Sequence, residues 1–139
     1  MAAYDLTGIV LKSGRTAMAT ATEAITAGDC VYKDTTDSVG LASSAGAGDG
    51  TKISTIGIAL ASAAIGDPCI YATNNSIVEC AGTGASVGSL SFLLDTGHTG
   101  PGSDLSVGNN DWRVITLVAL GAGADEFIFQ PTYDVRVYL

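Results

Sequence analysis

The chain holds few side chains that could carry out acid–base, nucleophilic or metal chemistry. Its single histidine, His98, stands in a glycine-rich stretch and could in principle act as a general base. Nothing beside it in the sequence resembles an activated nucleophile, and a loop histidine of this kind is usually just solvated. We therefore expect no catalysis at His98, and the sequence predicts that the protein is not an enzyme.

Two glycine-rich stretches fall short of nucleotide-binding loops. A phosphate-binding loop needs a lysine directly after its last glycine, so that the ammonium group reaches the phosphates. In Gly46–Lys52, Thr51 separates the two. Gly121–Gly123 lacks the third glycine and the following helix of a dinucleotide-binding turn. Gly46–Lys52 is therefore predicted to be a flexible surface loop.

Carboxylates and thiols are not spaced as metal ligands. Asp34 and Asp37 flank an expected turn but lack the glycine and the distal glutamate of a calcium loop. Cys30, Cys69 and Cys80 contain no C-x-x-C pair, which argues against zinc. An odd, sparse cysteine count does not make a disulfide framework, so we expect buried free thiols. No metal or other cofactor is predicted.

A degenerate repeat places Asp29 and Asp67 in equivalent positions. Residues Ala27–Tyr32 (AGDCVY) resemble Ile65–Tyr71 (IGDPCIY), and Val87–Phe92 (VGSLSF) is a weaker third copy. In each copy the glycine permits a positive φ, the next polar side chain can cap the turn, and a strand follows. We therefore expect Asp29 and Asp67 to cap turns rather than to form a catalytic carboxylate pair.

The elements around these residues have the rhythm of an all-β protein, because short apolar runs are broken by Gly, Asp, Asn and Ser. Alanine in Thr16–Ala27 and Ile53–Ala64 favours helix, but their Thr and Ile content and the interrupting Gly57 lead us to expect strand. Hairpin turns are expected at Asp34–Ser38 and Thr73–Asn75. The other predicted strands are Leu6–Lys12, Cys30–Lys33, Lys52–Leu60, Cys69–Ala72, Ser76–Ala81, Leu90–Leu94, Trp112–Leu120, Phe127–Gln130 and Tyr133–Leu139.

With 139 residues, the chain is expected to form a single domain. The pattern predicts a β-barrel or β-sandwich of short antiparallel strands. Two long Gly-rich loops are expected, at Ser43–Thr51 and Thr96–Asn110. Residues 1–15 are expected to be an N-terminal arm or first strand, and residues 16–139 the β domain.

Charge is sparse and negative. Charged residues make up 14% of the chain, hydrophobic residues 47%, and the formal net charge is −8. No Lys or Arg stands between Ile53 and Trp112. Nucleic-acid binding needs clustered cations, so it is not expected. A surface this poor in charge suits burial against other subunits, although a small-residue β protein without partners fits the composition equally well.

The sequence also bears on where the protein is made. The N-terminus lacks the basic and apolar regions of an export signal, which predicts synthesis in a cytoplasm. The longest apolar run, around Val114–Ala119, is too short to span a bilayer, so no membrane association is expected.

Candidate contact residues lie towards both ends of the chain. The N-terminal segment carries two basic residues and could reach a partner. Trp112, beside Arg113, is expected to be either the edge of the core or an intersubunit anchor, because aromatic residues and Arg are enriched at interfaces. Trp112–Leu120 is apolar on both faces, which predicts cover on both by a second sheet or a neighbouring subunit. Tyr133–Leu139 alternates and is expected to be sheet-paired, within the subunit or across a threefold axis. The candidate interface residues are Lys12, Arg15, Trp112, Arg113, Tyr133, Val135, Val137, Tyr138 and Leu139.

Three segments resemble one group of small virion proteins. AITAGDCVYKDTTDSVGLA, GIALASAAIGDPCIYATNNSIVECAG and DWRVITLVALGAGADEFIFQP are similar, in that order, to the decoration (cement or head-stabilising) proteins of tailed-phage capsids. The resemblance covers roughly residues 24–130, and its motifs are turns and strands. The matching residues are Ala27–Tyr32, Gly57–Leu60, Gly66–Tyr71 and Val114–Gly121.

This resemblance implies a β-barrel or β-sandwich subunit, commonly trimeric, that binds the outer surface of an assembled phage capsid and stabilises it by bridging capsomers. The implied partners are further copies of the chain, as a homotrimer, and the major capsid protein. The implied location is the virion, after synthesis in the host bacterial cytoplasm. No catalytic residues carry over. The alternative is a receptor- or glycan-binding β module of a phage fibre or adhesin, with Trp112 and tyrosines exposed around Thr96–Asn110.

Overall fold

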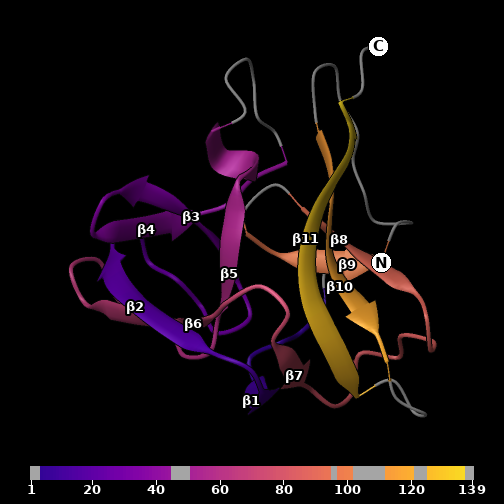
Figure 1. The fold of residues 1–139 in the computed structure, drawn as a ribbon. Helices are drawn as coiled ribbons and strands as arrows, with labels where there is room; N and C mark the ends of the chain where they lie inside the picture. The colour runs from indigo at the N-terminus through magenta and orange to yellow at the C-terminus, as the bar shows by residue number, and fades with distance from the viewer. Residues whose placement is uncertain (1–3, 45–50, 95–96, 102–111, 121–124, 137–139) are drawn as a thin grey trace.

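The computed structural model describes residues 4–44, 51–94, 97–101, 112–120 and 125–136, without the side chains of residues 51, 101, 112–113 and 133–136. The described chain is all-β apart from one 3-10 turn (Figure 1). Its elements are β1 (Val10–Ser13), β2 (Thr16–Ala21), β3 (Cys30–Thr35), β4 (Ser38–Leu41), η1 (Thr51–Ile53), β5 (Thr55–Ala59), β6 (Pro68–Ala72), β7 (Ile77–Glu79), β8 (Leu90–Leu93), β9 (Thr99–Pro101), β10 (Trp112–Ala119) and β11 (Glu126–Arg136).

The strands form a closed barrel packed against an open sheet. The barrel has the order β2-β4-β3-β5-β6, and the six-stranded sheet has the order β1-β7-β11-β10-β8-β9. In Figure 1 the barrel lies on the left and the sheet on the right, with β5 between them. The expected all-β fold is therefore confirmed. One detail differs from the expected antiparallel arrangement, because β2 and β4 pair in parallel across the barrel seam.

In sequence, the barrel is an insertion between two neighbouring strands of the sheet. β1 pairs with β7, and all five barrel strands fall between them. The two ends of the insertion meet, since the Thr73 N–H donates to the Arg15 carbonyl (3.0 Å) and the Arg15 N–H donates to Ser76 Oγ (3.2 Å). The first strand expected within residues 1–15 is thus the edge strand of the sheet.

Residues 4–13 pack on their own chain rather than projecting as an arm. The Leu6 and Ile9 side chains are buried in the core, and β1 is paired. The Tyr4 N–H donates to the Thr99 carbonyl at 2.9 Å, so this segment runs from β9 at one edge of the sheet to β1 at the other. Its apolar positions at 6 and 9 face inward, which is why it stays on the molecule.

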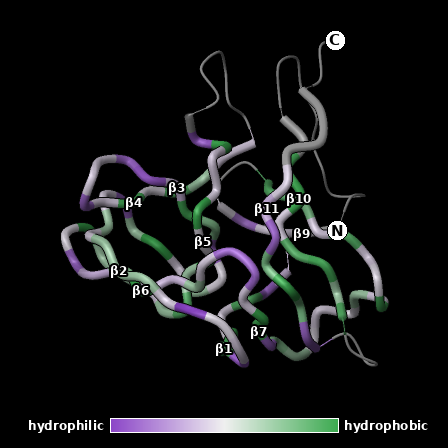
Figure 2. The backbone as a smooth tube through the Cα atoms, viewed as in Figure 1, coloured by the Kyte–Doolittle hydropathy of each residue, from purple (hydrophilic) through white to green (hydrophobic). Residues whose placement is uncertain are grey.

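Two apolar clusters hold the layers together. One fills the barrel, and the other lies between the barrel wall and the inner face of the sheet. β3 serves both, because Val31 points into the barrel cluster while Cys30 and Tyr32 point towards the sheet. A strand buried on both faces reads as a continuous apolar run, as CVY does here. Hydrophobic residues follow β5, β10 and much of β11 (Figure 2).

The repeated Gly-polar motif builds three equivalent turns. In each, a backbone hydrogen bond joins the first and fourth residues: Asp29 to Thr26, Asp67 to Ala64, and Ser89 to Ser86. The third residue is a glycine at positive φ, 92° at Gly28, 87° at Gly66 and 80° at Gly88. These are the features of type II turns, and each turn leads into a strand. The predicted turn-then-strand unit is confirmed in all three copies.

Other local expectations are met in part. The Asp34–Ser38 hairpin is confirmed, since β3 and β4 pair across it. Thr73–Asn75 is a turn but not a hairpin, because it leads from β6 in the barrel to β7 in the sheet. Thr16–Ala27 is strand only to Ala21.

Three segments differ from expectation for reasons of pairing. β4 follows the expected hairpin turn but is not among the expected strands, and β9 stands inside the expected loop Thr96–Asn110. Each is a short strand completed by pairing, β4 with β3 and β2, and β9 with β8. The two strands expected at Phe127–Gln130 and Tyr133–Leu139 are one strand as far as Arg136, which continues through Pro131. Residues 137–139 and most of the two expected long loops lie outside the described residues.

Candidate functional site

The outer face of the six-stranded sheet carries a row of apolar side chains. Cross-strand pairing sets Ile77 opposite Ile128, Ile128 opposite Val118, and Val118 opposite Leu90. These four residues, from β7, β11, β10 and β8, are called the apolar row below. Leu90 is 43% exposed and the other three are half-buried. Beside the row, Ile115 pairs with Phe92, and both are also half-buried.

Strand alternation explains why this face is apolar. On β11, Phe127 and Phe129 are fully buried against the barrel, so Ile128 between them must point outward. On β10, the pairing register shifts between Ile115 and Leu117, which leaves Ile115 and Val118 outward while Val114 and Leu117 are buried. The prediction that β10 is apolar on both faces is confirmed, but only its inner face is fully covered by the described chain.

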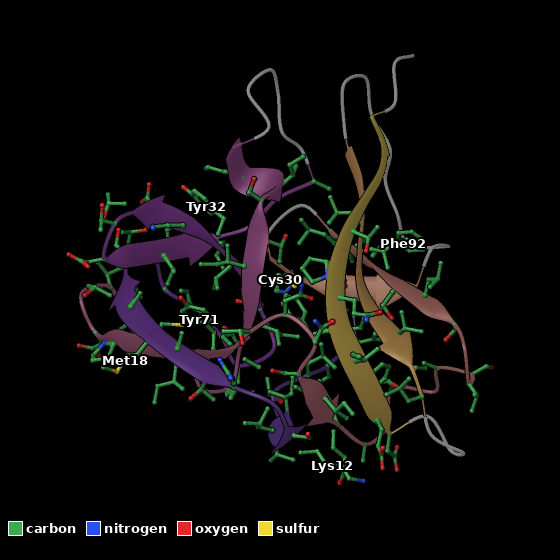
Figure 3. The ribbon with its side chains drawn as sticks, in the orientation of Figure 1. Lys12, Met18, Cys30, Tyr32, Tyr71 and Phe92 are labelled. Atoms are coloured by element: carbon green, nitrogen blue, oxygen red, sulfur yellow. The ribbon has the colours of Figure 1, made fainter. Side chains whose placement is uncertain are left out.

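A small charged group borders the apolar row. Lys12 on β1 pairs with Glu126 and lies 3.8 Å from Glu79. The two carboxylates raise the pKa of the Lys12 ammonium, with the Glu126 hydrogen bond as the largest cause. Exposed pairs of this kind contribute little to stability. Lys12, predicted as a contact residue, is thus already paired within its own chain and lies at the edge of the molecule in Figure 3.

The other predicted contact residues lie elsewhere on the molecule. Arg15 is exposed, and its main-chain N–H and carbonyl form hydrogen bonds at the junction between the barrel and the sheet. β10 and β11 pair Trp112 with Arg136 and Arg113 with Val135, so these residues meet where β10 begins and β11 ends. In Figure 1, β1, the strand that carries Lys12, lies at the opposite end of β11. Tyr133 lies further along β11, opposite Val114. Their side chains, and Val137, Tyr138 and Leu139 entirely, lie outside the described structure.

A cavity of about 430 Å³ opens between three segments that are distant in sequence. Its walls are Tyr4–Thr7 from the N-terminal segment, Thr26–Asp29 from the turn before β3, and His98–Thr99 at the start of β9. The Cys30 N–H donates to the Gly97 carbonyl at 2.7 Å, which holds the second and third segments together. A side chain on Gly28 would overlap Leu6, so the glycine lets the first segment lie close against the turn.

Asp29 and His98 lie within hydrogen-bonding distance of each other in this cavity. Asp29 Oδ1 lies 3.2 Å from His98 Nδ1, and Asp29 Oδ2 accepts a hydrogen bond from the Thr26 N–H at 2.9 Å. Asp29 is only 5% exposed. Burial raises the pKa of its carboxyl, and the bonds from Thr26 and His98 offset part of that rise. The predicted capping role of Asp29 is confirmed. His98 is exposed, as expected of a loop histidine, and in addition contacts Asp29.

Asp5 is the second carboxylate of the cavity. Its Oδ1 accepts hydrogen bonds from the Thr7 N–H (3.1 Å) and the Thr7 hydroxyl (2.7 Å), and these bonds lower the pKa of the Asp5 carboxyl. Sequence reasoning did not find Tyr4 or Asp5 as cavity residues. Only the tertiary fold brings residues 4–7 beside residues 98–99, and the sequence carries no local signal for that contact.

The three cysteines lie buried as free thiols, as predicted. Burial raises the pKa of Cys30 to about 12 and also raises the pKa of Cys69 and Cys80. Cys30 lies near the middle of the molecule, between β5 and the sheet (Figure 3). Among the described residues, no three His, Cys, Asp or Glu side chains gather closely enough to hold a metal ion.

Comparison with known proteins adds no relative. No family model matches the chain, and no curated protein matches it either. Within the part of the chain that is described, no helix is long and apolar enough to cross a membrane.

Proposed function

We propose that this chain is a structural virion protein that binds the outer surface of an assembled phage capsid and stabilises it by bridging capsomers. The observation that carries the proposal is the apolar row on a sheet face that the described residues cover only in part, in a chain with few charged residues. The resemblance of the Gly-Asp turn-and-strand segments to decoration proteins points in the same direction.

The apolar row fits a permanent contact between copies of the chain. Interfaces between subunits that stay together are more apolar than transient ones, and their centres are poor in charge. The row crosses four strands, and Ile115 and Phe92 extend it with a second apolar pair. We place the homotrimer contact on this face, with the trimer as the form that seats on the capsid.

Leu90→Asp tests this assignment. Leu90 is already 43% exposed, so the substitution should leave the monomer folded while placing a charge at the β8 end of the apolar row. We expect the variant to sediment as a monomer where the wild type is a trimer. We also expect its binding to capsids assembled without this protein to fall by at least about tenfold.

Ile65→Asp is the matched control. Ile65 is 71% exposed and lies in the turn before β6, outside the apolar row. It should leave both trimer and capsid binding unchanged. A wild type that stays monomeric at high concentration and ignores bare capsids would refute the proposal, and saturable binding to a glycan array in its place would favour the receptor- or glycan-binding alternative.

A further inference from the structure

The proposed contact through the apolar row does not involve the cavity between residues 4–7, 26–29 and 98–99. It combines a buried carboxylate, Asp29, with an ionised surface carboxylate, Asp5. Among its described wall residues there is no Lys or Arg, and the only basic group is the half-exposed His98. Its volume of about 430 Å³ lies in the range of small-ligand sites.

The described residues compensate the charge of Asp29 only in part. Its two described partners are one backbone N–H and one imidazole. A carboxylate has about four acceptor positions, so each oxygen can take a further donor. A cation brought to this carboxylate would replace the water that burial has removed.

The remaining walls are partly apolar. Tyr4 and Ala27 are half-buried, Leu6 is 4% exposed and lines the cavity with what remains, and the Gly28 backbone adds no side chain. Lys and Arg bury their methylene stems along such surface while the charged head finds polar partners. The cavity therefore pairs an apolar wall with an anionic wall, which matches an alkyl chain that ends in a cation.

We propose that this cavity binds the side chain of a lysine or arginine presented by a partner protein. The ammonium or guanidinium group lies at Asp29 and Asp5, and the stem lies against Leu6 and Ala27. This deepens the proposed function, on which it rests for the partner: the segment of the capsid that meets this end of the molecule presents a basic residue. The bond made is a charge-assisted hydrogen bond, and no covalent step is involved.

The site can be tested without a capsid, so its failure is separable from failure of the proposed function. The probe is n-butylammonium, with n-butanol as the neutral molecule of the same shape. Titrated into isotopically labelled wild-type protein, n-butylammonium should give saturable NMR shifts at the amides of Thr7, Thr26 and Thr99. n-Butanol should bind at least about tenfold more weakly, since it lacks the charge.

Substitutions then show which carboxylates bind the cation. Asp29→Asn keeps an oxygen for the Thr26 N–H and removes the charge, so it should weaken n-butylammonium binding by about tenfold or more. Asp5→Asn, at an exposed position where folding is not at stake, should also weaken it. Asp67→Asn is the matched control, because Asp67 holds the same turn position outside the cavity, and it should change nothing.

Three results would overturn the proposal. They are an absence of saturable shifts in the wild type, equal binding of butanol and butylammonium, and undiminished binding in both Asp29→Asn and Asp5→Asn. Equal binding of the two probes would mean that the cavity is only an apolar pocket. None of these results would change the outcome of the trimer and capsid-binding tests with Leu90→Asp, which test the proposed function separately.

Discussion

At the scale of single residues, the same turn is used under different constraints. Gly28 and Gly66 both adopt a positive φ, at 92° and 87°. A Cβ at Gly66 would meet open space, whereas at Gly28 it would overlap Leu6. The first glycine is thus required by backbone conformation and by packing, and the second by conformation alone.

The paired substitutions Gly28→Ala and Gly66→Ala separate these two causes. Gly66→Ala should lower the free energy of unfolding by about 1 kcal/mol, the cost of a left-handed alanine. Gly28→Ala should cost a further ~1–3 kcal/mol, because Leu6 must move. Urea unfolding followed by fluorescence measures both, and equal losses would show that the N-terminal segment is not held against the turn.

At the scale of elements, two buried threonines, one on β9 and one on β10, form a hydrogen bond with each other although β8 lies between these strands in the sheet. Thr99 Oγ1 and Thr116 Oγ1 lie 2.6 Å apart, and Thr116 Oγ1 also donates to the Ser91 carbonyl at 3.3 Å. Both threonines are fully buried. A buried hydroxyl that loses its hydrogen-bond partner still carries the cost of its desolvation. The Thr99–Thr116 hydrogen bond therefore holds β9 against the sheet, and with it Thr99, which lines the cavity.

Thr116→Val should therefore destabilise the protein by about 1–3 kcal/mol, because it leaves the Thr99 hydroxyl with only the Cys30 thiol nearby. The double variant Thr99→Val, Thr116→Val should cost clearly less than the sum of the two single variants, since no hydroxyl of the pair is then stranded. Thermal or urea unfolding of the four proteins completes the cycle. Additive losses would contradict a direct bond between the two hydroxyls.

How far the sequence predicts these elements depends on the range of the contacts. Turn and strand at Gly28–Asp29 follow from local residue types, and the structure confirms them. β9 could not be predicted, since Thr-Gly-Pro is a poor strand by composition and is completed by β8 and by the Tyr4 N–H. The Asp29–His98 pair joins residues far apart in the chain, so no spacing rule signals it. The outward position of Val118 likewise depends on a register shift that only pairing reveals.

At the scale of the whole molecule, an acidic chain carries an apolar row on one sheet face, bordered by Lys12, Glu79 and Glu126. The net charge of −8 opposes any meeting of copies, while the row favours it. Salt screens the charge repulsion between copies beyond a distance of about 8–10 Å, and it leaves the attraction between apolar surfaces almost unchanged. Association through this face should therefore respond to salt in the opposite direction from association through ion pairs.

Raising NaCl from about 20 mM to about 300 mM should accordingly tighten the proposed trimer several-fold. Sedimentation velocity across a dilution series measures the change. Leu90→Asp should remain monomeric at both salt concentrations. A trimer that dissociates as salt rises would instead place the contact on charged groups and away from the apolar row.

The barrel is a self-contained insertion in the chain. It begins after Arg15 and ends before Thr73, two residues joined by a hydrogen bond, and the strands on either side of it, β1 and β7, pair with each other. A short reverse turn from β1 to β7 would close the gap that its removal leaves. Evolution, or an engineer, could exchange such a module for another while the threading of the remaining strands stayed the same. Unrelated-looking members of one lineage could then share a sheet and differ in the body mounted upon it.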